Sequence, residues 1–116
     1  MDVLKRAKGR AFILCVDSAN AFLLDRDIIP DMVCTMDAKK GKKYFSNPKI
    51  KEVPLAISND TDMNVLNMMG EIHPFYMSVS SDYYEKLYGD QGADITYMEG
   101  GGSVATICFQ MAVELG

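Results

Sequence analysis

The chain has 116 residues, of which 48% are hydrophobic and 24% are charged, with a net charge of -4 at pH 7, as in an ordinary domain with a single core. This charge argues against nucleic acid as the main partner, because a phosphate backbone requires a broad basic surface. No apolar run approaches the roughly 20 residues of a membrane span, and residues 1–10 are too polar for a secretion signal, so we expect a cytoplasmic protein with no membrane partner.

The N-terminal third predicts a helix end followed by a buried strand. Residues 1–8 are amphipathic, and Gly9 is suited to stop a helix there. The uninterrupted apolar run 11–16 is typical of a parallel strand covered on both faces. Asp17 therefore stands at the carboxyl end of the first strand.

The next segment predicts a helical crossover and a second strand. Ser18 is expected to cap a helix that ends before the turn at residues 29–31, and the helix has an apolar face made of Ala19, Phe22 and Leu23. Residues 32–36 form the second apolar run, and Asp37 follows it. A helical crossover makes the two strands parallel, so both carboxylates are expected at the sheet edge where α/β proteins bind ligands.

Residues 38–52 predict a loop with at most a short helix near 39–46, because the segment is polar and interrupted by Gly41 and Pro48. It carries four lysines that form either a solvated face or a lid attracting phosphate, namely Lys39, Lys40, Lys42 and Lys43.

The middle of the chain predicts a third strand and a second helix. The strand covers residues 53–58, with Pro54 at its beginning, where a missing N–H is tolerated. Three residues can cap the following helix: Asn59, Asp60 and Thr61. The apolar face of that helix contains Met63, Leu66 and Met69, and Gly70 ends it.

The rest of the chain continues the alternation. We expect strands at 75–80 and 95–98 and a helix over 82–88, and His73 should be a turn residue at a strand entrance. Together these elements predict an α/β fold, a single three-layer sandwich over residues 1–116 with a mostly parallel sheet of about five strands.

A glycine-rich turn at residues 99–103 leads into the last predicted helix. Its apolar positions have helical spacing: Val104, Ile107, Cys108, Met111, Ala112 and Leu115. Gly101, Gly102 and Ser103 either form a tight strand-to-helix turn or bring backbone N–H groups close to a phosphate.

The cysteines and the single histidine do not suggest a metal centre of the zinc type. Cys15, Cys34 and Cys108 each lie in an apolar segment, so we expect buried, reduced thiols. No cysteine pair has the spacing of zinc ligands.

The strand-end carboxylates are the candidates for chemistry. Asp37 either holds a magnesium ion that bridges phosphates or caps the next turn. Asp17 could bind a ribose hydroxyl or assist the metal, and Ser18 beside it is a further candidate for nucleotide or phosphate binding. Asp60 and Asp62 are either further metal ligands or helix-capping residues, and Ser58 and Asn59 could hydrogen-bond a nucleotide at the same edge.

Two stretches, CVDSANAFLLDRDIIPDMVCTMD and GGGSVATICFQMAVELG, resemble the 6-hydroxymethylpterin diphosphokinase MptE-like family, which also includes motility-associated flagellin glycosyltransferases. The matching features are the turn at 16–19, the Pro30–Asp31 pair, Asp37 and the helix start at 101–106. The resemblance covers residues 11–116. It implies a Rossmann-like nucleotide-binding domain with Asp37 and Asp17 near metal and phosphates.

The resemblance also leads us to expect a chain truncated at both ends, since the family's upstream glycine-proline-serine motif and the strand after its last helix are missing. The favoured activity is magnesium-dependent transfer of a diphosphate from ATP to a pterin-like hydroxymethyl acceptor. The alternatives are a glycosyltransferase that uses a nucleotide sugar on flagellin and a non-catalytic structural module. A small-molecule nucleotide is the expected partner, and a homo-oligomer is compatible with the sequence.

Overall fold

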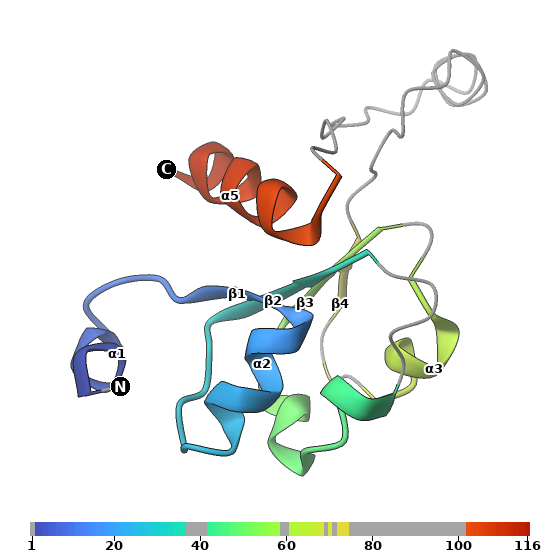
Figure 1. Cartoon of the computed structure of the whole chain (residues 1–116), viewed down its shortest axis with the longest axis horizontal. Helices are drawn as coiled ribbons and strands as arrows, with labels where there is room; N and C mark the ends of the chain where they lie inside the picture. The colour runs from blue at the N-terminus through green and yellow to red at the C-terminus, as the bar shows by residue number, and fades with distance from the viewer. Residues whose placement is uncertain (1, 37–41, 59–60, 69, 71, 75–101) are drawn as a thin grey trace.

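The computed structural model describes residues 2–36, 42–58, 61–68, 70, 72–74 and 102–116 (Figure 1). The α-helices, 3-10 helices (η) and strands are, in chain order, α1 (Asp2–Ala7), β1 (Leu14–Val16), α2 (Asp17–Leu24), β2 (Met32–Thr35), η1 (Lys42–Tyr44), η2 (Pro48–Glu52), β3 (Leu55–Ile57), α3 (Met63–Leu66), β4 (Ile72–Pro74) and α5 (Val104–Leu115). Within these ranges, no helix has the length and apolar character needed to cross a membrane.

The four strands form one parallel sheet in the order β1-β2-β3-β4. Because successive parallel strands are joined by right-handed crossovers, an unbroken order places all the connecting segments on the same face. The segments α2, η1, η2 and α3 accordingly lie on one side of the sheet, and α5 covers the other (Figure 1).

Alternating side chains divide the strands between two apolar clusters. The register pairs Cys15 with Val33 and Val33 with Leu55, and all three belong to the cluster beneath α2. The next register row, which belongs to the cluster beneath α5, consists of Val16, Cys34 and Ala56. The continuous apolar runs of the sequence therefore reflect strands buried on both faces.

The first strand and helix differ from the prediction at their borders. β1 begins at Leu14 rather than at residue 11, and Phe12 is 60% exposed. α2 begins at Asp17 with Val16 as its N-cap and no capping side-chain bond, so the expected cap by Ser18 is wrong. Phe22 is 47% exposed, whereas Asn20 is fully buried, because the helix turns Asn20 toward the sheet and Phe22 toward its outer side.

The segment after β2 is more compact than predicted. It contains η1 and η2, and Phe45 and Ile50 from this segment are buried in the cluster beneath α2. In α3, Asp62 is the cap and accepts a hydrogen bond from the Asn64 N–H (2.8 Å). The expected buried residue Met63 is 67% exposed, and Val65 takes the core position instead.

In the C-terminal half, α5 (Val104–Leu115) confirms the predicted last helix, and β4 is a strand that the sequence did not predict at this place. β4 occupies residues 72–74 and includes His73, which is therefore a strand residue and not a turn residue. The predicted elements at 75–80, 82–88 and 95–98 lie outside the described residues. The α/β class with a parallel sheet is confirmed, and the fifth strand remains a prediction.

The three cysteines are free and buried, as predicted. Burial, with the nearby Cys108 and Asp17, raises the pKa of Cys15 to about 12. The hydrogen bond to Cys108 and burial raise the pKa of Cys34. The same hydrogen bond lowers the pKa of Cys108.

Candidate functional site

The candidate site lies at the carboxyl ends of the first three strands. Asp17 directly follows β1, Thr35 is the last residue of β2, and Ser58 directly follows β3. Because the strands are parallel and neighbouring, these three residues meet at one edge of the sheet. All three are at most 2% exposed, so they form the floor beneath this edge.

Asp17 joins the end of β1 to the end of β2. The Ser18 N–H donates to its Oδ1 (2.6 Å), and the buried Thr35 hydroxyl donates to its Oδ2 (3.1 Å). The carboxylate also begins α2, where the exposed N–H groups of the first turn favour a negative charge. Both oxygens of Asp17 are thus engaged within the protein, and the side chain is 1% exposed.

A second set of hydrogen bonds joins β2 to β3. The Ser58 N–H donates to the Thr35 carbonyl (3.3 Å) and to Thr61 Oγ1 (3.2 Å). The Thr61 hydroxyl donates to the same Thr35 carbonyl (3.3 Å), and the Ser58 hydroxyl donates to the Met36 carbonyl (3.5 Å). The strand ends are therefore held in a fixed relation, which is what a rigid binding edge requires.

Asn20 connects this edge to the segment after β2. Its Nδ2 donates to the Tyr44 carbonyl (3.2 Å), which holds η1 against α2. Its Oδ1 is buried and accepts no hydrogen bond, an arrangement that costs free energy in a folded protein. Residues 38–41, which bring the chain into η1, lie outside the described residues.

The start of α5 lies over the same edge. Val104, its first residue, packs in the cluster that also contains Val16 and Met36 from the ends of β1 and β2. Ser103 caps the helix by accepting from the Thr106 N–H (3.4 Å), which confirms the predicted helix start. Gly102 has a φ of +80°, a conformation that favours glycine, and both residues are exposed.

Several of the predicted site residues lie outside the described residues, namely Asp37, Asn59, Asp60 and Gly101. The role of the lysine segment also stays open, since Lys39 and Lys40 lie outside as well. Lys43 is exposed, with its Nζ 5.6 Å from the Tyr44 ring centroid.

Asp62 is described, and its Oδ1 accepts from both the main-chain N–H (2.8 Å) and the side-chain Nδ2 (2.9 Å) of Asn64. It therefore serves as a helix cap, the second of the two roles considered for it. Across the described ranges, no three His, Cys, Asp or Glu side chains are grouped so that they could hold a metal ion. Both oxygens of Asp17 accept hydrogen bonds within the protein, and Oδ1 of Asp62 accepts two from Asn64, so these two residues alone do not form a magnesium site, and a metal role for Asp62 stays a prediction.

Another aspartate, Asp31, has its partners at the opposite edge of the sheet. The Ile13 N–H donates to its Oδ2 (2.8 Å), and Lys8 forms an ion pair with it. The hydrogen bond from Lys8 lowers the pKa of Asp31, and the Ile13 bond acts in the same direction. Asp31 therefore ties α1, β1 and β2 together at the amino ends of the strands.

The polar residues Asn20, Thr35 and Thr61 were not expected from the sequence. Thr35 belongs to an apolar run, and Thr61 was expected only as a helix cap. The sequence feature that these three residues share is a hydroxyl or amide side chain at the end of a strand or about one helical turn after it. Such side chains are too frequent in loops for this feature to identify a site.

Comparison with known proteins gives one match. A family model described as "6-hydroxymethylpterin diphosphokinase MptE-like" matches residues 1–116, the whole chain. Neither the curated proteins nor the solved structures give a significant match.

Proposed function

Because the chain belongs to the 6-hydroxymethylpterin diphosphokinase MptE-like family, we propose that it is a nucleotide-dependent transferase domain that moves a diphosphate from ATP to a pterin-like hydroxymethyl acceptor. In this reaction the acceptor oxygen attacks the β-phosphorus of ATP. The bond from that phosphorus to the oxygen shared with the α-phosphate breaks, and AMP leaves. The acceptor hydroxyl loses its proton to the surrounding water or to a base.

The observation that carries the proposal is the buried hydrogen-bond network at the strand ends, taken with the family. Asp17, Thr35 and Ser58 hold three parallel strands in register at the edge where α/β proteins bind ligands. A fixed edge favours a reaction that depends on positioning two substrates. We further propose that the complete domain is a Rossmann-like three-layer sandwich with a fifth strand at 95–98.

The start of α5 is the proposed phosphate-binding element. The first turn of this 12-residue helix has N–H groups with no acceptor inside the helix; Ser103 accepts from that of Thr106, and the others attract an anion. The exposed Gly102 and Ser103 stand before that turn, over the ends of β1 and β2. Phosphate oxygens bound there would lie at the same edge as Asp17.

The magnesium part of the proposal rests on Asp37 and Asp60. Asp17 and Asp62 already accept hydrogen bonds from the protein, so we assign them no metal and derive no step through one. We propose that Asp17 acts by positioning Ser18 and Thr35. A magnesium ion, when bound, would neutralise charge on the phosphate groups.

The test is an assay of AMP formation by chromatography, with ATP, magnesium and 6-hydroxymethyl-dihydropterin. We expect AMP and the acceptor diphosphate to appear in equal amounts. Asp37→Asn should abolish turnover, and Asp2→Asn, at an exposed position in α1, should not change it. Undiminished turnover in Asp37→Asn, or no binding of ATP to the wild-type chain, would refute the proposal. Transfer from a nucleotide sugar in place of ATP would favour a glycosyltransferase.

A further inference from the structure

Two of the three cysteines lie together between α5 and the sheet. Cys34 of β2 and Cys108 of α5 belong to the apolar cluster beneath α5, and a hydrogen bond joins their side chains. They come from places far apart in the chain, and α5 contacts β2 directly. Thiols within hydrogen-bond reach of each other are candidates for a disulfide, whose sulfur atoms lie about 2.05 Å apart. We call Cys34 and Cys108 the thiol pair.

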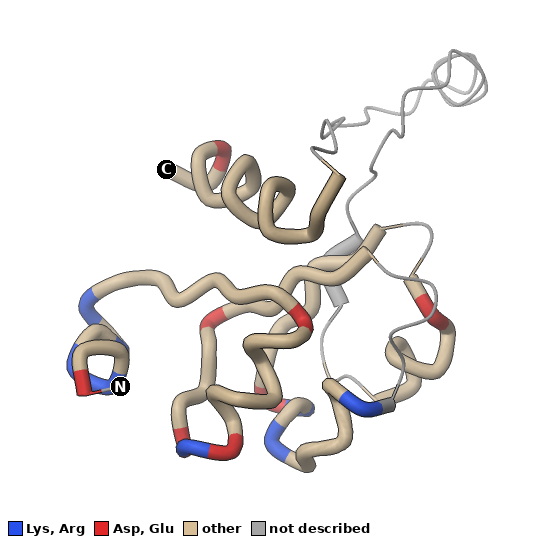
Figure 2. Tube along the Cα trace, viewed as in Figure 1, with Lys and Arg blue, Asp and Glu red and all other residues tan. Residues whose placement is uncertain are grey.

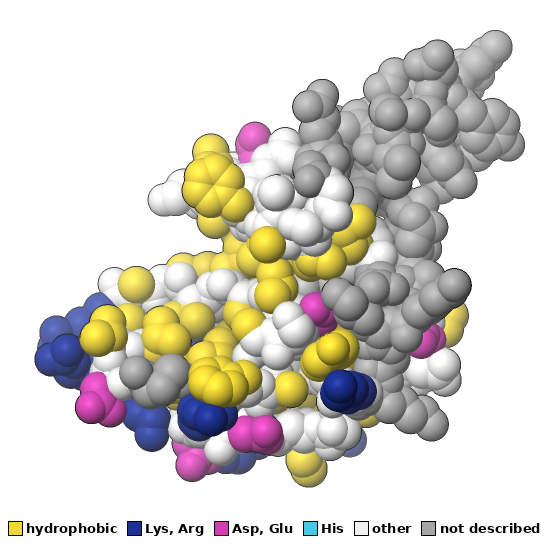
Figure 3. Space-filling view, viewed as in Figure 1, with side chains coloured by type: hydrophobic (Ala, Val, Ile, Leu, Met, Phe, Trp, Pro, Cys, Tyr) yellow, Lys and Arg dark blue, Asp and Glu magenta, His cyan; other side chains and the backbone are white. Residues whose placement is uncertain are grey.

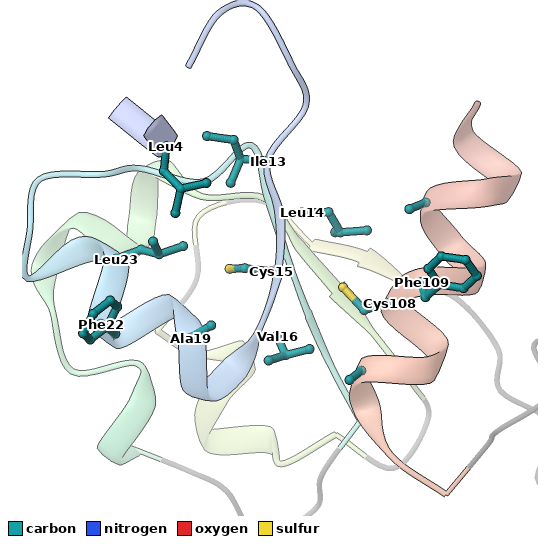
Figure 4. Close-up of a pocket in the computed structure, with 12 residues that line it drawn as sticks. Leu4, Ile13, Leu14, Cys15, Val16, Ala19, Phe22, Leu23, Cys108 and Phe109 are labelled. Carbon is teal, nitrogen blue, oxygen red and sulfur yellow. The ribbon is translucent and has the colours of Figure 1, made fainter. Parts of the chain in front are cut away.

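The fold directs both side chains of the thiol pair into the same layer. Cys34 stands in a register row between Val16 and Ala56, and this row belongs to the cluster beneath α5. Cys108 is one of the three buried residues of α5, on the helix face that packs on the sheet. Figure 4 shows its side chain directed from α5 toward the strands. The contact between the two cysteines therefore follows from the packing of α5 on β2.

The surroundings of the thiol pair are apolar. Figure 3 shows hydrophobic side chains gathered between α5 and the layer below it. Figure 2 shows α5 with a single charged residue, Glu114, near its C-terminal end. Because α5 carries no Lys, Arg or His, no cation of this helix favours the thiolate of Cys108. The hydrogen bond from Cys34 takes that role.

The two sulfur atoms of the thiol pair are not equivalent. The Cys34 S–H donates to Cys108 Sγ, which lowers the pKa of Cys108 and raises that of Cys34. Cys108 is 8% exposed, whereas Cys34 is fully buried. The thiolate is the nucleophile in thiol oxidation. Cys108 is therefore the sulfur that a small oxidant meets first, and Cys34 is placed to react with the product.

We propose that Cys108 and Cys34 form a reversible disulfide when the protein meets hydrogen peroxide, so that α5 becomes covalently joined to β2. Cys108 Sγ loses its proton and attacks one peroxide oxygen. The O–O bond breaks, the departing oxygen takes the proton and leaves as water, and a sulfenic acid remains on Cys108. Cys34 Sγ then attacks Cys108 Sγ. The S–O bond breaks, and the hydroxide takes the Cys34 proton and leaves as a second water.

Cys15 serves as an internal control for this chemistry. It is buried like the thiol pair, but it belongs to the cluster beneath α2, and Figure 4 shows its side chain directed toward α2. The strand backbone therefore stands between Cys15 and the layer of the thiol pair. Burial, with the nearby Cys108 and Asp17, raises the pKa of Cys15 to about 12, so this thiol stays protonated near neutral pH. We expect Cys15 to remain a thiol.

The disulfide would change how α5 is held. Among the described residues, apolar packing connects this helix to β2. A bond between Cys34 and Cys108 closes a loop from residue 34 to residue 108 and restricts the unfolded chain. The oxidised protein should therefore unfold at a higher urea concentration than the reduced protein. This proposal requires only β2 and α5, so it does not depend on the proposed transferase activity.

Peptide mapping of the full chain after treatment with hydrogen peroxide tests the proposal. Remaining thiols are blocked with iodoacetamide in urea, and trypsin then leaves the three cysteines on separate peptides, residues 11–26, 27–39 and 87–116. We expect a link between 27–39 and 87–116 within one chain, which dithiothreitol removes, and a blocked thiol on 11–26. The proposal would be overturned by a link that includes 11–26, by links between two chains only, or by the absence of any link.

Three single variants test the order of the steps. Cys108→Ala should slow the oxidation of Cys34 at least about 10-fold, because the nucleophile is lost. Cys34→Ala should leave a sulfenic acid on Cys108 that dimedone traps. Cys15→Ala is the matched control and should form the link at the wild-type rate. Equal oxidation of Cys34 in Cys108→Ala and in the wild type would refute the assigned roles. Far-UV circular dichroism shows whether each variant is folded, and the mapping of the wild-type chain depends on none of them.

Discussion

Replacing Asp17 tests whether this carboxylate is first of all a structural anchor. Asp17→Ala removes the acceptor of the Thr35 hydroxyl (3.1 Å), which is 1% exposed and could not turn to water. A buried polar group left without its partner costs about 1–3 kcal/mol, and the helix start loses a favourable charge worth about 0.5 kcal/mol. We expect Asp17→Ala to lower the free energy of unfolding by about 2–3 kcal/mol.

Asp17→Asn should destabilise the protein less than Asp17→Ala does. The amide keeps the shape of the carboxylate, its oxygen can accept from the Ser18 N–H, and its Nδ2 can donate to Thr35 Oγ1. We expect a loss of about 1 kcal/mol. Thr35→Val removes the hydroxyl from the other side, and the double variant Asp17→Ala with Thr35→Val should cost about 1–2 kcal/mol less than the sum of the single changes.

Urea denaturation followed by circular dichroism gives these free energies. Asp25→Ala is the matched control, since Asp25 is exposed at the other end of α2, and it should fall within about 0.5 kcal/mol of the wild type. A loss below about 0.5 kcal/mol for Asp17→Ala, or strict additivity in the double variant, would refute the anchor role. The carboxylate would then be available to a ligand in the way expected from the sequence.

Two further predictions concern other parts of the fold. Gly70→Ala would place its Cβ 2.3 Å from the main-chain oxygen of Lys51, so we expect a loss of about 1–3 kcal/mol in urea denaturation, whereas little change would show that the backbone yields there. The pKa of Asp31 is lower in the folded state than in the unfolded chain. Its contribution to the free energy of unfolding is therefore fully present above the unfolded pKa, near 4, and is lost as the pH falls through the folded pKa. The stability difference between wild type and Asp31→Asn, about 1 kcal/mol at pH 7 after solvent screening, should shrink as the pH falls below the unfolded value and vanish once the carboxyl is protonated in the folded state, and a difference that does not change with pH would contradict the assignment.

The alternation of strands and helices could be predicted because burial on both faces leaves continuous apolar runs. The residues at which the strands begin and end could not be predicted in this way. Ala11 and Phe12 are as apolar as Leu14, but β1 begins only where β2 lies beside it, with the Ile13 carbonyl accepting from Asp31 and Met32. The partner strand, and not the local residue type, decides where a strand starts.

Part of the candidate site could also be predicted from the sequence, but for a different reason. Parallel strands bring their carboxyl ends together, so Asp17 and Ser58 could be placed at one edge from the pattern alone. The burial of Asn20 and Thr35 depends on how α2 and β2 face each other, which no local pattern encodes. Asp37 lies outside the described residues, so its metal-binding role stays a prediction.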